Sequence, residues 1–382
     1  MIIYKMICAR VWLVIIVVLI IILVILSVLV CRGSSKENVM IRPGGGKKRL
    51  RLFNLDLHIS VIEDVKTHLQ RYFGDEVDLV EWCISGHSHI MGKERSNPRY
   101  INNSEWRNID RDRIGKFVME NREFLSSFDG FIVTHSPVFA LIYQSFGKPI
   151  YVVNSCRFDQ PFGGGNIEMR EYLVGELRRM SDEGMLRVVS NNKGDRDYFG
   201  EQTGIMTDHI PSLCKYTGVR YVGNREEFLY CGGIDIDMPN VVSKSSLPAG
   251  YEWSLICEFR GVIHVPYEIS TMSIFEQYTS CIPLIVPSKR FLKELGTLIT
   301  VDVYDVLSSS KYANIDEWIE RADFYDEGNM PYVSYFDSWD ELRELLGYID
   351  TRKITRLMSD WNIERTRSIE SSMDRSFDIF KV

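Results

Sequence analysis

The residues best suited to chemistry lie in the segment 264–288, which reads HVPYEISTMSIFEQYTSCIPLIVPS. This pattern predicts a strand, a turn and then a helix whose first residues are polar. Free backbone N–H groups at the start of a helix bind anions, and hydroxyl groups there add hydrogen bonds to a diphosphate. Helix capping alone also explains serine and threonine at such a start. The polar residues concerned are Ser270, Thr271 and Ser273.

Two carboxylates accompany this helix start. Glu276 lies one turn into the predicted helix, where its carboxylate can reach the sugar hydroxyls of a nucleotide. Glu268 precedes it by eight residues, on the loop before the helix. Because capping does not explain this second acid, the segment favours a nucleotide-binding site over a capped surface helix.

An arginine follows another apolar run. Arg157 comes shortly after residues 149–153, PIYVV, which read as a buried strand. Its guanidinium can pair with a phosphate or a sugar, or with the nearby Asp159. Both interpretations stay open at the level of the sequence.

Two short patterns in the N-terminal half admit a different chemistry. Asp56-Leu57-His58 is a D-x-H pattern, and Gly86-His87-Ser88-His89 is a G-H-x-H pattern. Both occur in binuclear metallophosphoesterases, where they supply metal ligands for hydrolysis. That fold also uses a Gly-Asn-His sequence, which this chain lacks, and places G-H-x-H last. We therefore expect no metal site and keep a metallophosphoesterase as an alternative.

The elements that position these residues follow from an alternation of apolar runs and helical patterns. Such strands, hydrophobic on both faces and separated by helices, indicate parallel sheets covered on both sides. We expect an α/β fold with two Rossmann-like domains facing a cleft, in which ligands bind at the carboxyl ends of the strands. The predicted strands are 51–55, 77–84, 130–134, 149–153, 186–190, 228–231, 261–265 and 282–286.

Domain boundaries follow from the same pattern. The second series of strands is predicted to begin at residue 186, and the chain becomes helical and charged towards its end. The expected parts are a short tail at 1–10, an apolar span at 11–30, a basic flexible tether at 31–50, a first Rossmann-like domain at 51–185, a second at 186–335 and C-terminal helices at 336–382.

Residues 11–30 read VWLVIIVVLIIILVILSVLV, without a charge. Twenty such residues in a helix span about 30 Å, the thickness of the hydrocarbon core of a bilayer. The run is longer than the core of a signal peptide and lacks a small-residue cleavage site. It predicts a single-pass membrane anchor whose partner is the lipid bilayer. The flanking charges and the short N-terminal tail favour opposite orientations, so the side of the membrane stays open.

Charge is distributed unevenly along the chain. Residues 1–51 hold nine Lys and Arg and one Glu, so their net charge is +8, whereas the whole chain has −7 and the remainder therefore −15. An acidic folded part excludes a broad nucleic-acid surface, which needs a basic footprint. Any phosphate must be held by local groups. The six cysteines after residue 31 are scattered without a C-x-x-C pattern, so we expect no structural zinc.

The spacing Glu268-x7-Glu276, followed by Ile282-Pro283-Leu284, resembles the donor-site signature of GT-B glycosyltransferases. The resemblance implies that the second acid holds the ribose of a nucleotide sugar and that the first contacts the transferred sugar. Lys193-Gly194 matches the position of a phosphate-binding lysine in that family. The glycine-rich turn and the companion arginine of the family are missing, so retention or inversion stays open.

A broader resemblance covers most of residues 52–345. The stretches FNLDLHISVIEDV, EWCISGHSHI, PYEISTMSIFEQY and ADFYDEGNMPYVSYFDSWDEL are similar to glycosyltransferases of large DNA viruses. This similarity implies a fold and a reaction class rather than a substrate.

The resemblance implies a membrane-anchored glycosyltransferase. It would move a sugar from a nucleoside-diphosphate sugar, without another cofactor, to the hydroxyl of a glycan or glycoconjugate. Residues 51–185 would bind the acceptor and residues 186–335 the donor. In inverting members the general base lies on loops of the first domain, which implies Asp56, His58 or His87. A membrane-tethered nucleotide-sugar-binding module without turnover is the second alternative.

Overall fold

The computed structural model describes residues 49–163, 165–299 and 310–381, without the side chain of Asp56. The predicted tail, the predicted membrane-spanning segment 11–30 and nearly all of the tether 31–50 lie outside these residues. Among the helices that are described, none is both long and apolar enough to cross a membrane.

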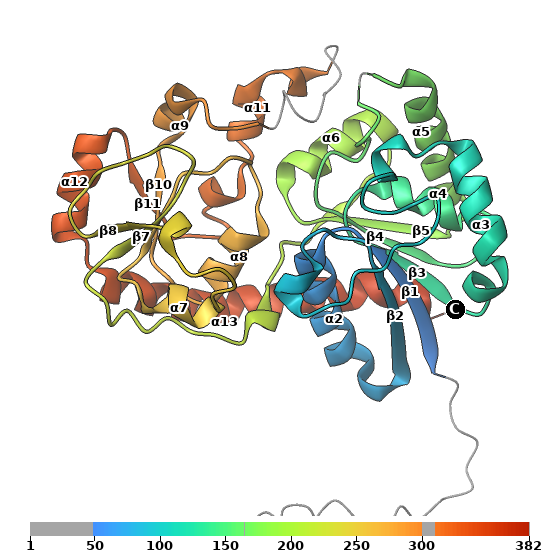
Figure 1. The fold of residues 1–382 in the computed structure, drawn as a ribbon, viewed down its shortest axis with the longest axis horizontal. Helices are drawn as coiled ribbons and strands as arrows, with labels where there is room; N and C mark the ends of the chain where they lie inside the picture. Colours follow the sequence, from blue (N-terminus) through green and yellow to red (C-terminus); the bar gives the residue numbers. More distant parts are fainter. Residues whose placement is uncertain (1–48, 164, 300–309, 382) are drawn as a thin grey trace, which may run out of the picture. The chain divides into compact units, whose positions relative to one another are not determined.

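A six-stranded parallel sheet forms the first domain, in the order β2-β1-β3-β4-β5-β6 (Figure 1). β3 and β4 are buried along their whole length, as their apolar, β-branched sequences predict. Its strands are β1 (Leu50–Asp56), β2 (Val77–Cys83), β3 (Gly130–Val133), β4 (Ile150–Asn154), β5 (Leu186–Ser190) and β6 (Asp208–His209).

A second parallel sheet of five strands has the order β11-β10-β9-β7-β8. β7, β9 and β10 are fully buried, again in agreement with their apolar sequences. Its strands are β7 (Phe228–Cys231), β8 (Val241–Ser243), β9 (Val262–His264), β10 (Leu284–Pro287) and β11 (Ser334–Phe336).

Helices connect the strands in both domains, and several begin at a side-chain cap. Asp110, Asn166 and Asn192 each accept a hydrogen bond from the backbone N–H three residues further on. The first domain contains α2 (Ile59–Phe73), α3 (Arg111–Ser126), α4 (Ala140–Tyr143), α5 (Ile167–Asp182) and α6 (Lys193–Thr203). The remaining helices are α7 (Trp253–Glu258), α8 (Met272–Thr279), α9 (Lys289–Leu295), α11 (Ile315–Ile319), α12 (Trp339–Tyr348) and α13 (Thr351–Ser376).

The boundary between the domains differs from the prediction. β5, which we expected to open the second domain at residue 186, pairs with β4 and continues the first sheet, and β6 follows it. The second sheet begins with β7 at Phe228. Alternating strands and helices indicate where strands occur, but the pattern does not contain the hydrogen-bond partner of each strand, so it placed the boundary too early.

The C-terminal helices contribute to both domains. α12 buries Leu342 and Leu346 in the core of the second sheet. The end of α13 and the following 3-10 turn, Phe377–Phe380, pack instead against β4, where the rings of Phe377 and Tyr151 lie 5.1 Å apart. Residues 351–381 therefore bridge back to the first sheet rather than forming a separate unit.

Each sheet contains a point at which the strand order reverses. The chain leaves β1 for β2 on one side and reaches β3 on the other, and β7 has the same relation to β8 and β9. Ligands of open parallel sheets bind at the carboxyl ends of the strands that flank such a point. The segments concerned are those after β1 and β3 in the first domain and those after β7 and β9 in the second.

Candidate functional site

The predicted anion site at residues 270–273 lies at the start of α8, directly after the turn that follows β9. Thr271 is the N-cap residue, but its hydroxyl caps no backbone N–H and lies 3.1 Å from that of Ser273. Ser270 is instead hydrogen-bonded to the buried Asp323. Among the side chains that the structure describes, none caps the backbone N–H groups at this helix start.

Glu276 is half-buried, and side chains from two other segments hold its carboxylate. The Tyr216 hydroxyl donates to Oε1, and the Trp253 indole Nε1–H donates to Oε2 at 3.1 Å. Burial raises the pKa of Glu276, and the hydrogen bonds from Tyr216 and Trp253 oppose this shift. The carboxylate points into the protein, with its orientation fixed, and not into bulk solvent.

Glu268 lies in a buried ion cluster. Its Oε1 atom accepts a hydrogen bond from Arg157 Nη1 at 3.2 Å and another from its neighbouring backbone N–H of Ile269. Arg157 also pairs with Asp195 at 3.0 Å and stacks on the ring of Trp318, 4.7 Å from its centroid. The structure thus brings two predicted site residues, Arg157 and Glu268, together as an ion pair.

Asp159, the alternative partner predicted for Arg157, pairs with other side chains through its Oδ2 atom. Asp159 accepts hydrogen bonds from Arg170 Nε and the Tyr198 hydroxyl, each at 2.8 Å. Asp195, and not Asp159, pairs with Arg157. Burial raises the pKa of Asp195 to about 6, and the charge of Arg157 opposes this shift. A charged arginine at this buried position therefore requires the two acids Asp195 and Glu268.

Lys193 lies at the start of α6, in the first domain rather than in the second, where the sequence placed it. Its ammonium group pairs with Asp326 at 2.8 Å. Lys193 is 38% exposed, so it stays accessible to a ligand at the price of that ion pair. Its phosphate-binding role stays a prediction.

A different lysine, which the sequence did not single out, lies at the carboxyl end of the second sheet. Lys244 directly follows β8, and its charge acts on Glu276, on Tyr267 and on His264 at the end of β9. Burial lowers the pKa of Lys244, but Cys231 and Tyr251 raise it by more, so that the pKa lies above its usual value.

Within the described chain, no carboxylate lies within 4 Å of the Lys244 ammonium group. The sequence offered little signal for this residue, because β8 has only three residues and was not predicted.

Two histidines meet at the switch point of the first sheet. His58 follows β1 and His135 follows β3, and their rings stack with centroids 5.8 Å apart. Burial lowers the pKa of His58 to about 4 and that of His135 to about 3, so both are neutral at pH 7. Sequence reasoning missed His135, because only the strand order β1-β3 makes it a neighbour of His58.

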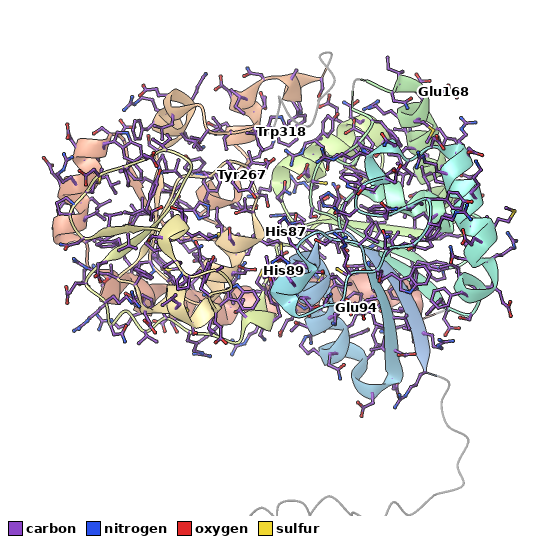
Figure 2. The ribbon with its side chains drawn as sticks, viewed as in Figure 1. His87, His89, Glu94, Glu168, Tyr267 and Trp318 are labelled. Atoms are coloured by element: carbon purple, nitrogen blue, oxygen red, sulfur yellow. The ribbon has the colours of Figure 1, made fainter. Side chains whose placement is uncertain are left out.

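His87 and Asp56 occupy the neighbouring strand ends. His87 is exposed on the segment after β2, 6.4 Å from the ring of His89 (Figure 2). It lies close enough for its charge to lower the pKa of His58, after the larger effect of burial. Asp56 ends β1, and its side chain lies outside the described atoms. Among the side chains that are described, no group of three or more His, Cys, Asp or Glu is arranged to hold a metal ion.

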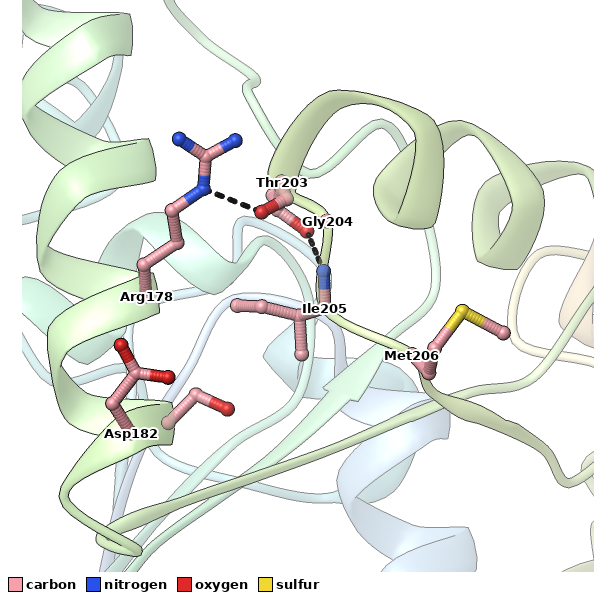
Figure 3. Close-up of a pocket in the computed structure, with 7 residues that line it drawn as sticks. Arg178, Asp182, Thr203, Gly204, Ile205 and Met206 are labelled. Carbon is pink, nitrogen blue, oxygen red and sulfur yellow. Dashed lines mark hydrogen bonds between the residues drawn. The ribbon is translucent and has the colours of Figure 1, made fainter.

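A cavity of about 500 Å³ lies elsewhere in the first domain, near the ends of α5 and α6 (Figure 3). Arg178 spans it and donates from Nε to the Thr203 carbonyl at 2.6 Å. None of the predicted site residues lines it. Its lining residues are Arg178, Ser181, Asp182, Thr203, Gly204, Ile205 and Met206.

Comparisons with known proteins found no match among protein-family models or curated proteins. Solved structures with a related arrangement include the glycotransferase of kitacinnamycin, with a TM-score of 0.47 and 10% identity over 88% of this chain and 99% of that one. The glycosyltransferase SnogD from Streptomyces nogalater has a TM-score of 0.43 and 10% identity, over 86% of this chain and 100% of that one. The spinosyn rhamnosyltransferase SpnG, complexed with thymidine diphosphate, has a TM-score of 0.39 and 10% identity, over 83% of this chain and 96% of that one. Because these TM-scores are below 0.5, we rest the functional proposal on the side chains.

We predict that Arg157→Ala lowers the free energy of unfolding by about 3–5 kcal/mol, since it removes from two buried acids, Asp195 and Glu268, the arginine that they share. Arg187→Ala is the matched control, because Arg187 pairs with Asp208 at the surface and such pairs contribute about 1 kcal/mol or less. Urea unfolding of both variants measures the difference. Equal losses in the two variants would show that the buried cluster is not a principal contact.

Proposed function

We propose that this chain is a glycosyltransferase that uses a nucleoside-diphosphate sugar as donor. The observation that carries the proposal is the position of Glu276: its carboxylate is fixed on α8, beside the switch point of the second sheet and near Lys244. A carboxylate with free lone pairs next to uncapped helix amides and a lysine suits a ligand that combines hydroxyl groups with a diphosphate.

In this proposal the donor binds along the start of α8. The Glu276 carboxylate accepts hydrogen bonds from the pentose hydroxyls, while the backbone N–H groups at residues 271–273 and the Lys244 ammonium group hold the diphosphate. We expect these groups to stabilise the leaving diphosphate without a metal ion, because they already supply positive charge where negative charge develops.

The acceptor, a hydroxyl of a glycan or glycoconjugate, binds at the carboxyl end of the first sheet. Its oxygen forms a bond to the anomeric carbon of the sugar, and the bond from that carbon to the diphosphate breaks with its electron pair. The proton of the hydroxyl passes to a base. We assign that base to His58, because it follows β1 at the switch point of the first sheet and its imidazole is neutral at pH 7.

The donor site predicts which variants lose nucleotide binding. We expect Glu276→Ala to weaken binding of UDP, GDP or thymidine diphosphate, whichever binds the wild type best, by about tenfold or more, since it removes hydrogen bonds to a charged group. Lys244→Gln should weaken binding of the nucleoside diphosphate to a similar extent, but should not weaken binding of the corresponding nucleoside. Isothermal titration calorimetry measures each dissociation constant.

Lys193→Gln is the matched control for this experiment, because it also removes one lysine charge. A large loss in Lys193→Gln with none in Lys244→Gln would return the phosphate site to the lysine that the sequence predicted. Unchanged nucleotide binding in Glu276→Ala would remove the basis of the proposal.

The base assignment predicts a separation of binding from turnover. His58→Ala should lower the transfer rate by about a hundredfold or more and leave the nucleotide dissociation constant unchanged. Because burial lowers the pKa of His58 to about 4, the wild-type rate at saturating donor should fall only as the pH drops towards that value. Rates with a panel of nucleotide sugars between pH 4 and 8 test both expectations.

Other outcomes of the same experiment identify the alternatives. If Asp56→Asn or His87→Ala abolishes transfer while His58→Ala does not, the base is one of these two residues. If the wild type binds nucleotide sugars but transfers none of them, the chain is a nucleotide-sugar-binding module without turnover. Bound metal ions and inhibition by chelators would favour the phosphoesterase alternative.

We further propose that residues 11–30 anchor the enzyme in a lipid bilayer as a single-pass protein, on the strength of twenty consecutive residues without a charge. The full chain should then remain with the membranes after carbonate washing, whereas a chain starting at residue 49 should be released. Release of both chains would exclude the anchor. Protease protection of residues 49–382 in sealed vesicles would assign the side of the membrane.

A further inference from the structure

Glu276 does not hold its orientation by itself. Its two oxygens are bound by donors from different segments, Tyr216 of the turn Lys215–Thr217 and Trp253 at the start of α7. The rings of Tyr216 and Trp253 meet edge to face, with centroids 5.8 Å apart. Because a carboxylate oxygen has two lone pairs, each oxygen keeps one lone pair for a ligand. The hydrogen bonds from Tyr216 and Trp253 determine where these remaining lone pairs point.

The segment that carries Tyr216 is itself fixed by the first domain. It belongs to the connection between β6 and β7, the last strand of the first sheet and the first of the second. The Asp64 carboxylate on α2 accepts hydrogen bonds from the backbone N–H groups of Leu213 and Cys214, at 3.2 and 2.7 Å. Cys214 adopts a positive φ of 53°, a conformation that a non-glycine residue keeps only when its surroundings enforce it.

A second contact fixes the same connection from the C-terminal helix. Arg365 on α13 is buried and donates from Nη2 to the Ser212 carbonyl at 2.8 Å. Asp64 and Arg365 together leave the backbone before Tyr216 little freedom. The position of the Tyr216 hydroxyl is thus set by contacts outside the donor domain.

We propose that Tyr216 is a positioning residue for the donor, whose hydroxyl orients the Glu276 carboxylate towards the pentose of the nucleotide sugar. The proposal rests on the function proposed above. It adds a residue of the interdomain connection to the donor site, so the affinity for the donor depends on a side chain that need not touch the donor. Asp64 lies on α2, which starts directly after His58. The same helix therefore adjoins the proposed base, His58, and fixes the connection that carries Tyr216.

The charge of Glu276 provides a readout that a merely structural role would not change. Burial raises the pKa of Glu276, and the hydrogen bond from Tyr216 lowers it. Loss of that hydroxyl therefore raises the pKa, and a donor site that needs the ionised carboxylate loses affinity at a higher pH than before. The titratable groups that act on Glu276 are Tyr216, Cys214, Asp64 and Lys244, and none but Tyr216 is altered by the test.

The test compares Tyr216→Phe with Tyr221→Phe by calorimetry with the best-binding nucleoside diphosphate from pH 5 to 8. Tyr221 lies on the same connection, and its hydroxyl donates to the Arg260 carbonyl at 2.8 Å, away from Glu276. Tyr216→Phe should bind about tenfold more weakly at pH 7 and lose affinity at a higher pH than the wild type. The donor KM should rise, with kcat and the acceptor KM nearly unchanged. Tyr221→Phe should match the wild type in affinity, in pH profile and in all of these kinetic constants.

Three results overturn the inference. Wild-type affinity and pH profile in Tyr216→Phe, with binding lost in Glu276→Ala, would refute the role of Tyr216 and leave the proposed function intact. Equal losses in both tyrosine variants would show a general loosening of the connection. Absence of nucleotide binding by the wild type would refute the proposed function, and the inference with it. Trp253→Phe removes the other hydrogen bond to the Glu276 carboxylate. It should reproduce the shift in pH profile and so support the inference.

Discussion

The arrangement of the site depends on a buried arginine that joins the two parallel sheets. Arg157, shortly after β4, is buried and pairs with Asp195 on α6 and with Glu268 on the loop before α8. An arginine in this environment keeps its charge only if acids accompany it, so the loop before α8 is held against the first domain. Gly194 permits the close approach, because a Cβ atom there would lie 2.6 Å from Ile269 Cδ1.

This contact changes the meaning of the pair of acids in the sequence. Glu268 and Glu276 were predicted to face one ligand. Glu268 contributes to the ion cluster, and its contact with the transferred sugar stays a prediction, whereas Glu276 lies near Lys244 on α8. The acidic net charge of the folded part also becomes compatible with an anionic ligand. The positive groups at the site are local: uncapped helix amides and a lysine without a carboxylate in contact, within the described chain.

Much of the fold could be predicted from the sequence, because apolar, β-branched runs such as 130–134 and 149–153 are direct consequences of burial on both faces of a sheet. The helix at Glu276 was predicted for a similar reason, from the polar residues at its start. The strand order could not be predicted, because the hydrophobic pattern of a strand does not indicate which other strands it pairs with. That is why β5 was assigned to the wrong sheet, and why His135, Lys244 and Tyr216 were missed: each acquires its role from a neighbour distant in the chain.

The most direct test of the account is a crystal structure of the protein with a bound nucleoside diphosphate. We expect the pentose hydroxyls within hydrogen-bond distance of the Glu276 carboxylate, and the diphosphate against the amides at residues 271–273 within reach of Lys244. A nucleotide bound with Glu276 still occupied only by Tyr216 and Trp253, or seated at the carboxyl end of the first sheet, would contradict it.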